Sequence, residues 1–301
     1  KRIRLTAICA ALLMAQPLAW AAIINADSEK EEDSENSKSE LPLIELGLGA
    51  GVAYFPDFRG SDNYSVFGLP TPVIVYRGKW LRSSRDEVKA LLFDSPRFDI
   101  NISGGGAVPV DSGRDNGREG MDDLDPTFNV GPSFNWLLSD PENRDSRLRL
   151  RLPIRAAFTA SFSDFKSLGF LIQPHLRYDH RWRQEDKLWS LSLRAGPLWA
   201  TRKFHDFYYS VDPQFATSER RAFDASGGYS GFRTSAGILH KRGRLSLGSF
   251  ASLDHLSGAQ FEDSPLVATK QSYVVGLFVA WKFWESETRA PRVEDDDAPA
   301  E

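Results

Sequence analysis

The sequence predicts an all-β protein, an antiparallel transmembrane β-barrel of about 12 strands, with 10 as the lower alternative. Three observations predict it: long alternation of apolar and polar residues, long connections that alternate with short ones, and aromatic residues at both ends of the expected strands. Transmembrane strands need about 9–11 residues, whereas strands in soluble sheets average about 5–6. Beyond the N-terminal segment there is no uncharged apolar run of about 18 residues, so helical membrane spans are not expected.

The stretch around 147–161 shows the alternation most clearly. Leucines and an isoleucine occupy even positions from Leu148 to Ile154, and arginines occupy odd positions from Arg147 to Arg155. Because successive strand residues point to opposite faces, one face is apolar and the other carries four guanidinium groups. Similar patterns predict strands at 43–55, 70–77, 79–85, 87–93, 97–107, 127–138, 147–161, 168–183, 187–203, 227–241, 244–256 and 271–283.

The connections give the barrel an orientation. Long loops are expected at 56–69, 108–126, 204–226 and 257–270, and short turns at 94–96, 139–146, 184–187 and 241–243. Bacterial outer-membrane barrels have long extracellular loops and short periplasmic turns. The expected periplasmic strand ends carry Trp136, Trp182, Trp189 and Trp281, and the opposite ends carry Tyr54, Phe128, Phe158, Phe170 and Trp199. These two groups are typical of the aromatic girdles of a barrel in the bacterial outer membrane.

The two ends of the chain are predicted to lie outside the barrel, which takes residues 43–284. Residues 1–21 form a signal peptide, with basic residues from Lys1 to Arg4, a short apolar core and Ala19-Trp20-Ala21 at the cleavage site. Residues 22–42 form an acidic, disordered periplasmic linker, and residues 285–301 an acidic, disordered tail. The single cysteine lies in the signal peptide, so the mature chain has no thiol for a disulfide or a nucleophile.

Seven arginines form a candidate binding site, which we call the basic wall. All are predicted to face the lumen from three neighbouring strands: Arg147, Arg149, Arg151, Arg155, Arg177, Arg181 and Arg194. In an open barrel this wall would favour anions and make a narrow anion-preferring pore. In a closed barrel the arginines would pair with inward Glu45, Asp99 and Asp179 as a structural network, which suits the planar guanidinium fork.

Catalytic and metal-binding patterns are weak. The histidines are scattered without metal-ligand spacing, and the acidic loop 111–125 lacks the ligand order of a calcium loop. A lipid-modifying enzyme remains a third hypothesis, since Asp254 and His255 lie near Ser252 and Ser257. His255, however, shares the outward parity of its strand. We therefore expect no catalytic residue, no metal, no cofactor and no nucleic-acid partner.

Several segments together resemble the MltA-interacting protein/OmpV family of outer-membrane proteins. The matching segments, in order along 43–283, are Gly47-Leu48-Gly49-Ala50-Gly51-Val52-Ala53-Tyr54-Phe55-Pro56, Arg59-Gly60-Ser61-Asp62-Asn63-Tyr64, Pro70-Thr71-Pro72, Tyr76-Arg77-Gly78, Tyr208-Tyr209-Ser210-Val211, Gly227-Gly228-Tyr229 and Asp263-Ser264-Pro265-Leu266-Val267. The resemblance implies a non-enzymatic scaffold for peptidoglycan remodelling, in contact with outer-membrane lipid and lipopolysaccharide. Its implied partners are a lytic murein transglycosylase and a murein synthase. No binding residue is carried over from the family.

Overall fold

A computed structural model describes residues 42–290 except 78–80, 84–87, 114–116, 144 and 161–164. The predicted signal peptide, residues 22–41 of the acidic linker and residues 291–301 of the tail lie outside the described residues. The strands are β1 (Ile44–Pro56), β2 (Tyr64–Arg77), β3 (Leu81–Ser83), β4 (Val88–Asp94), β5 (Phe98–Ala107), β6 (Thr127–Leu137), β7 (Ser146–Thr159), β8 (Ser167–Ile172), β9 (His175–Gln184), β10 (Lys187–Ala200), β11 (Gly228–Arg242), β12 (Leu245–His255) and β13 (Gln271–Glu285).

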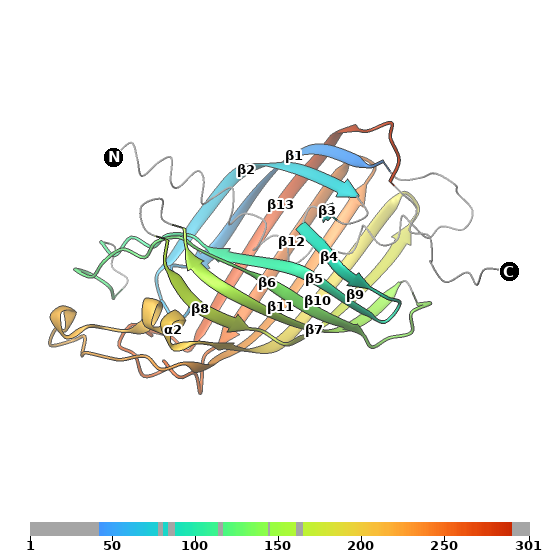
Figure 1. The fold of residues 1–301 in the computed structure, drawn as a ribbon. Helices are drawn as coiled ribbons and strands as arrows, with labels where there is room; N and C mark the ends of the chain where they lie inside the picture. The colour runs from blue at the N-terminus through green and yellow to red at the C-terminus, as the bar shows by residue number, and fades with distance from the viewer. Residues whose placement is uncertain are drawn as a thin grey trace.

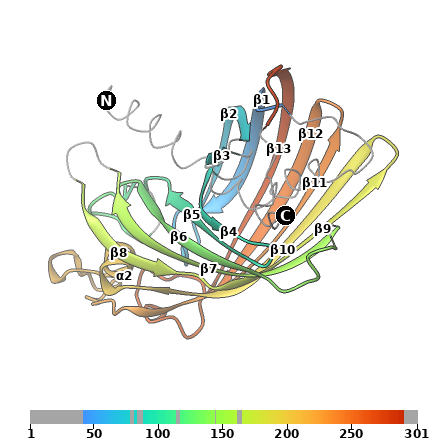
Figure 2. The same cartoon turned by 45° about the vertical axis from the view of Figure 1, so that its right-hand side comes forward.

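All strands belong to one antiparallel sheet that closes on itself (Figures 1 and 2). Apart from β8 and β9, each strand pairs with its neighbour in sequence, and β1 pairs with β13 from Glu45↔Glu285 to Tyr54↔Val275. Both β7 and β10 pair with β8 and then with β9, so β8 and β9 are two halves of one interrupted strand. Counted this way the described residues form a barrel of 12 strands, which confirms the prediction.

The interruption between β8 and β9 has a local cause. Pro174 stands in the gap and has no backbone N–H to donate to a neighbouring strand. On the facing strand β10, a Cβ added to Gly196 would lie 2.1 Å from the Pro174 carbonyl oxygen. The close approach of the two backbones therefore requires glycine at this position.

The loop predicted at 56–69 is shorter than expected, because β2 begins at Tyr64 rather than at residue 70. Pro70 and Pro72 both lie inside the strand. The Arg77 N–H donates to the Leu43 carbonyl on the β1 side. Since the N–H direction alternates along a strand, the missing N–H groups of Pro70 and Pro72 face the β3 side. On that side the register with β3 consists of Tyr76↔Ser83 and Arg77↔Arg82, and neither proline lies within it. The two prolines therefore interrupt no backbone hydrogen bond to β1 and lie beyond the pairing with β3.

The barrel wall is apolar outside and polar inside, as the alternation predicts. Leu48, Val66 and Leu277 are among many large apolar side chains on the outer surface, at 58%, 69% and 60% exposure. Polar side chains such as Asn101 and Ser133 are buried on the inner surface. An apolar belt of this extent needs lipid around it, and a closed sheet satisfies its backbone groups without water.

The predicted aromatic girdles are visible as ring contacts between neighbouring strands. Near the long-loop end, Phe128 pairs with Phe158, with 5.4 Å between ring centroids. Near the short-turn end, Trp182 pairs with Trp189, with 6.0 Å between centroids and nearly parallel rings. Each pair joins outward residues at one rim, where an amphipathic aromatic ring suits the membrane–water boundary.

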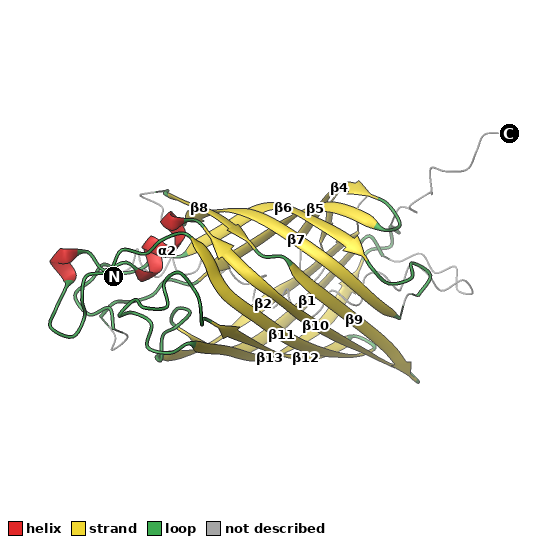
Figure 3. Cartoon of the chain, turned by 90° about the horizontal axis from the view of Figure 1, so that it is seen from below, coloured by secondary structure: helices red, strands yellow, loops and turns green. Residues whose placement is uncertain are grey.

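The long connections gather at one end of the barrel and contain two short helices, α2 (Arg202–Tyr209) and η1 (Pro213–Phe215) (Figure 3). Within the described ranges no helix is long and apolar enough to cross a membrane. The strand predicted at 187–203 is shorter in the structure, because β10 ends at Ala200 and α2 begins two residues later.

Four of the long loops pack into a small hydrophobic core, which we call the cap. Its buried members come from the β1–β2, β5–β6, β10–β11 and β12–β13 connections: Phe58, Val110, Leu124, Tyr208, Tyr209, Val211, Ala225, Leu256, Ala259, Phe261 and Leu266. At its centre the rings of Tyr209 and Phe261 stack with centroids 3.6 Å apart. The acidic loop 111–125 is predicted to be solvated, and that prediction is wrong for Leu124, which is buried in this core.

Candidate functional site

The structure brings the predicted basic wall together on the lumenal face of β7, β9 and β10. Arg149 of β7 lies opposite Arg177 of β9, and Arg177 lies opposite Arg194 of β10. Arg151, Arg177 and Arg181 are buried, and the other four arginines are half-buried. Odd-numbered residues thus face the lumen on β7 and β9, and even-numbered residues face it on β10, as the alternation predicts.

Asp179 and Asn135 are two of the side chains that meet this wall. The Arg177 Nε donates to both oxygens of Asp179, at 2.9 and 2.7 Å, and Arg149 Nη1 lies 3.5 Å from the same carboxylate. The Arg151 Nε donates to the Asn135 side-chain oxygen at 2.7 Å.

The other two predicted counter-charges act differently. Asp99 accepts a hydrogen bond of 2.7 Å from the Asn135 amide, so Asn135 connects it to Arg151. Glu45 lies on the other side of the barrel, 3.1 Å from Arg77 and 3.5 Å from Lys282. The basic wall therefore includes a structural network around Asp179 and Asp99.

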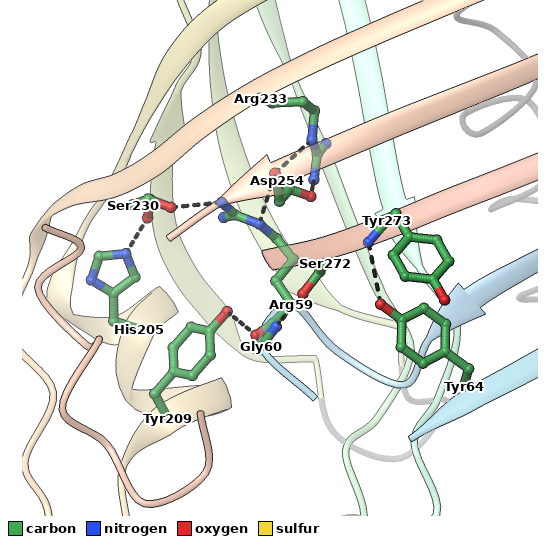
Figure 4. Close-up of polar contacts among 10 residues, drawn as sticks. All are labelled: Arg59, Gly60, Tyr64, His205, Tyr209, Ser230, Arg233, Asp254, Ser272 and Tyr273. Carbon is green, nitrogen blue, oxygen red and sulfur yellow. Dashed lines mark hydrogen bonds and ion pairs between the residues drawn. The ribbon is translucent and has the colours of Figure 1, made fainter. Parts of the chain in front are cut away.

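A second polar cluster, which sequence reasoning missed, lies where the cap meets the barrel (Figure 4). The buried Asp254 carboxylate accepts two hydrogen bonds from Arg233, at 2.9 and 2.7 Å, in a bidentate pair. Arg59 of the β1–β2 loop lies 3.2 Å from the same carboxylate and donates to the Ser230 carbonyl at 2.6 Å. Asp254 thus fastens a loop to two strands of the barrel.

Further hydrogen bonds fasten the cap to side chains on the inner face of the barrel (Figure 4). The Gly60 N–H donates to the Ser272 hydroxyl at 2.7 Å, and the Tyr209 hydroxyl donates to the Arg59 carbonyl at 3.0 Å. On the opposite side, the hydroxyls of Tyr208 and Thr127 lie 3.1 Å apart. Because the cap bonds to lumen-facing residues of β6, β12 and β13, its loops fold across the mouth of the barrel.

His205 of α2 links the cap to β11 through both ring nitrogens. Its Nδ1 lies 2.6 Å from the Ser226 carbonyl oxygen, so Nδ1 carries the proton, and the Ser230 hydroxyl donates to Nε2. Burial lowers the pKa of His205, and the nearby Arg59 charge lowers it further against the Ser226 hydrogen bond. The ring is therefore neutral at pH 7.

The Ser230–His205 pair has the donor–acceptor order of a nucleophile and its base. Its third partner is a backbone carbonyl rather than a carboxylate, and both side chains are at most 2% exposed. The sequence-based enzyme candidate is not assembled either, because adjacent Asp254 and His255 point to opposite faces and Asp254 is held by two arginines. The arrangement supports fastening of the cap better than catalysis.

Acid is expected to loosen the cap through His205. Its pKa in the folded cap is below the ordinary value of about 6.5, so the opened cap binds more protons below that pH. The stabilisation is fully present above about pH 6.5 and is lost as the pH falls toward the depressed value. The protection factors of residues 202–211, which are corrected for the intrinsic pH dependence of amide exchange, should fall between pH 7.5 and 5.5. The His205→Gln variant, which does not titrate, should show protection factors that do not change with pH, and an equal fall in that variant would contradict this role.

Arg118 supports the cap from the β5–β6 loop, in the acidic stretch predicted as solvated. It is buried and donates to the Tyr208 carbonyl at 3.2 Å. Burial and the charge of Arg220 lower its pKa to about 10, so it remains protonated at neutral pH. The Asp123 carboxylate accepts the Ser112 N–H at 2.9 Å. The acids of this loop thus help to shape the loop itself.

Three of the seven segments that carry the family resemblance, 59–64, 208–211 and 263–267, contribute to the cap. Arg59 and Gly60 make the contacts above, and the Ser264 hydroxyl donates to the Tyr209 carbonyl at 2.7 Å. Val211 and Leu266 are buried in the cap core. The resemblance therefore follows a specific loop arrangement as well as the strand pattern.

Comparisons with solved structures give low similarity. The NanC porin has a TM-score of 0.34 and 7% identity, covering 79% of this chain and 100% of that chain. LpxR from Salmonella typhimurium has a TM-score of 0.32 and 8% identity, and the match covers 79% of this chain and 100% of that chain. The outer membrane protease OmpT from Escherichia coli has a TM-score of 0.28 and 9% identity, and the match covers 82% of this chain and 99% of that chain. TM-scores below 0.5 support no transfer of activity from these proteins.

The family comparison is decisive where the structural ones are not. No curated protein matches the chain significantly. The family model for MltA-interacting protein MipA matches residues 48–283, which span β1 to β13 and include the cap and the basic wall. With its closed antiparallel sheet, apolar outer belt and polar lumen, the chain belongs to the MipA family of outer-membrane β-barrels.

Proposed function

We propose that this protein is a scaffold for murein-remodelling enzymes, with its partner surface at the periplasmic, short-turn end of the barrel. The family model, whose name describes interaction with MltA, supports a lytic murein transglycosylase as one partner. A murein synthase as second partner follows from the family resemblance. The extracellular mouth is covered by the cap, so the short-turn end offers the accessible polar surface.

One observation carries the proposal: the two acidic segments leave the barrel side by side. Pro42 and Arg289 form a β-bridge, and the Leu43 N–H donates to the Thr288 carbonyl at 2.8 Å. Residues 26–40 hold seven acids and two lysines, and residues 284–301 hold seven acids and two arginines. Two acidic segments that start from one point would attract a basic partner surface and speed its encounter.

The short turns offer a second contact surface at the same end of the barrel as the attachment points of these segments. Asp140 and Glu142 are exposed in the β6–β7 turn, and Glu185 is exposed in the β9–β10 turn. Long strands anchor both ends of each turn, which lowers the cost of ordering the turn when a partner binds. In this proposal the segments steer the partner and the turns hold it.

Removal of residues 26–40 and 291–301 from the full chain is expected to reduce recovery of a purified murein transglycosylase severalfold at low salt. Ser286 and Thr288 remain, because both bond at the start of β1. The difference should shrink at high salt, where exposed charges are screened beyond about 3–10 Å. Unaltered recovery would remove the acidic segments from the proposal, and no recovery with the intact chain would contradict the scaffold itself.

A further inference from the structure

The outer surface of the barrel carries two cations and two rings close together at the short-turn end. Lys187 of β10 lies opposite Arg242 of β11, and in the next outward row Trp189 lies opposite His240, with 4.4 Å between ring centroids. Ser190, of the opposite parity, is buried, so these four side chains point outward. Directly opposed strand residues have Cβ atoms about 4.5–5.5 Å apart, so the four side chains converge on one small area. We call this area the rim block.

The surroundings of the rim block are positively charged. The carboxylate of Asp186 accepts a hydrogen bond of 2.9 Å from the Arg242 Nε, and the charge of Lys187 also acts on it. A guanidinium has five N–H groups, so this bond leaves four of them able to donate to a ligand. The two hairpin ends at this rim, residues 183–187 and 242–245, hold four basic residues and two acids. This net positive charge attracts an anion.

The rim block lies where the barrel wall meets the membrane–water boundary. Trp182 and Trp189 form a pair of the aromatic girdle at this end. Toward the middle of the barrel, Leu193 and Ile238 are 41% and 37% exposed on the same outer face. Girdle rings lie at the level of the lipid headgroups, and the apolar residues beyond them contact acyl chains. A ligand of the rim block therefore has its charged group at the boundary and its apolar part along the wall.

The opposite end of the same two strands has a ring pair without such cations. There Trp199 of β10 lies opposite Tyr229 of β11, with 6.0 Å between ring centroids. Residues 195–200 and 228–232, which form these strand ends, include no charged residue. A girdle pair therefore does not require an opposed lysine and arginine beside it, and the two cations of the rim block need a reason of their own.

From this arrangement we infer that the rim block binds an anionic phospholipid of the periplasmic leaflet. The Arg242 guanidinium binds phosphate oxygens in pairs, and the Lys187 ammonium adds a point charge. The rings of Trp189 and His240 contact the glycerol region, and the acyl chains follow the apolar wall beyond them. A zwitterionic phospholipid carries an amine that the two cations repel, so the site selects its lipid by headgroup charge.

Native mass spectrometry of the full chain in detergent measures this preference. Phosphatidylglycerol and phosphatidylethanolamine with the same acyl chains are added in equal amounts, and the unaltered chain should retain more phosphatidylglycerol. A basic residue beside an anionic lipid changes binding about fivefold at low salt. The Lys187→Gln/Arg242→Gln variant should therefore lower the ratio of the two bound lipids about fivefold for each cation removed. Equal retention of both lipids by the unaltered chain would overturn the inference.

The Arg202→Gln/Lys203→Gln variant is the matched control. It also removes one lysine and one arginine, but from α2 at the cap end of the barrel. Arg202 and Arg242 are both 63% exposed, and each pairs with one exposed aspartate. Exposed pairs contribute little to stability, so both variants should fold. The control should keep the preference for phosphatidylglycerol. An equal loss in both variants would show a response to total charge and contradict a site at the rim block.

A phosphatidylglycerol with a photoreactive headgroup tests the unaltered chain without any substitution. Its labels should concentrate on residues 182–189 and 238–245, which form the two neighbouring hairpin ends. Labels spread evenly around the short-turn rim would refute the proposed site. Since neither experiment contains a murein enzyme, their outcomes do not depend on the scaffold proposal.

Discussion

Replacing Asp254 with alanine is expected to lower the free energy of unfolding by about 3 kcal/mol, because it leaves two arginines without their shared carboxylate. Asp254 is 2% exposed and holds Arg233 in a bidentate pair while it contacts Arg59. The side chains of the two arginines are 20% and 34% exposed, which places the loss at the lower end of the range for broken buried pairs. Urea unfolding followed by tryptophan fluorescence measures the change.

Asp186→Ala provides the matched control for this variant. Asp186 also pairs with an arginine, Arg242, at 2.9 Å, but the two side chains are 58% and 63% exposed. An exposed pair of this kind contributes about 0–1 kcal/mol. If Asp254→Ala and Asp186→Ala lose equal stability, burial does not set the strength of the Asp254 cluster and our account of the cap attachment is wrong.

Phe261→Ala should open the cap while the barrel stays intact. Phe261 is fully buried, stacks on Tyr209 and meets the His205 ring edge-on at 4.8 Å. Loss of a buried phenylalanine costs about 3–5 kcal/mol, and here the loss falls on a small core that can open separately from the strands. Hydrogen exchange should accelerate in α2 and in residues 256–267, while the far-ultraviolet circular dichroism of the sheet should not change.

Phe170→Ala is the control for that experiment. Phe170 lies on the outer surface of β8 and is 54% exposed to the surrounding lipid or detergent. Its removal leaves the cap core intact, so exchange in α2 should not change. A Phe261→Ala variant whose α2 amides remain as protected as in the unaltered chain would contradict the packing that we describe.

The strands were predictable because their signal is local. Alternation of side chains along 147–161 follows directly from strand geometry, and it placed all seven wall arginines on the lumenal face. The interrupted strand at 168–183 was predicted as continuous, although Pro174 marks its break. The early start of β2 at Tyr64 was not predicted, because whether a proline is tolerated inside a strand depends on which neighbour its missing N–H faces, and the alternation does not show this.

The cap was not predictable in the same way, because its core joins loops far apart in sequence. Phe58, Val110, Tyr209 and Phe261 come from four separate connections, and no local periodicity links them. A signal was nevertheless present. The aromatic run from Phe204 to Tyr209 is too apolar for a solvated loop, and it forms the packing face of α2. Large apolar residues inside long barrel loops thus indicate a packed cap.

For the candidate sites, too, the direction of a side chain along a strand was predictable and contacts between distant loops were not. The parity argument put His255 outside and so put Asp254 inside, but the sequence could not show that Arg59 would return from a distant loop to meet it. Likewise His205 and Ser230 are 25 residues apart and meet only because α2 folds back over β11. Contacts across the barrel mouth depend on loop closure, which strand patterns do not encode.

In-cell photo-cross-linking from the periplasmic turns tests the scaffold proposal most directly. A photoreactive residue at Glu142 or Glu185, both exposed at the short-turn end, should capture a murein transglycosylase or synthase identified by mass spectrometry. The same probe at Gln214, exposed in the extracellular β10–β11 loop, serves as the matched control. We predict capture from the two turns and none from Gln214. Recovery of only the neighbours that an unrelated barrel also captures would contradict the scaffold function.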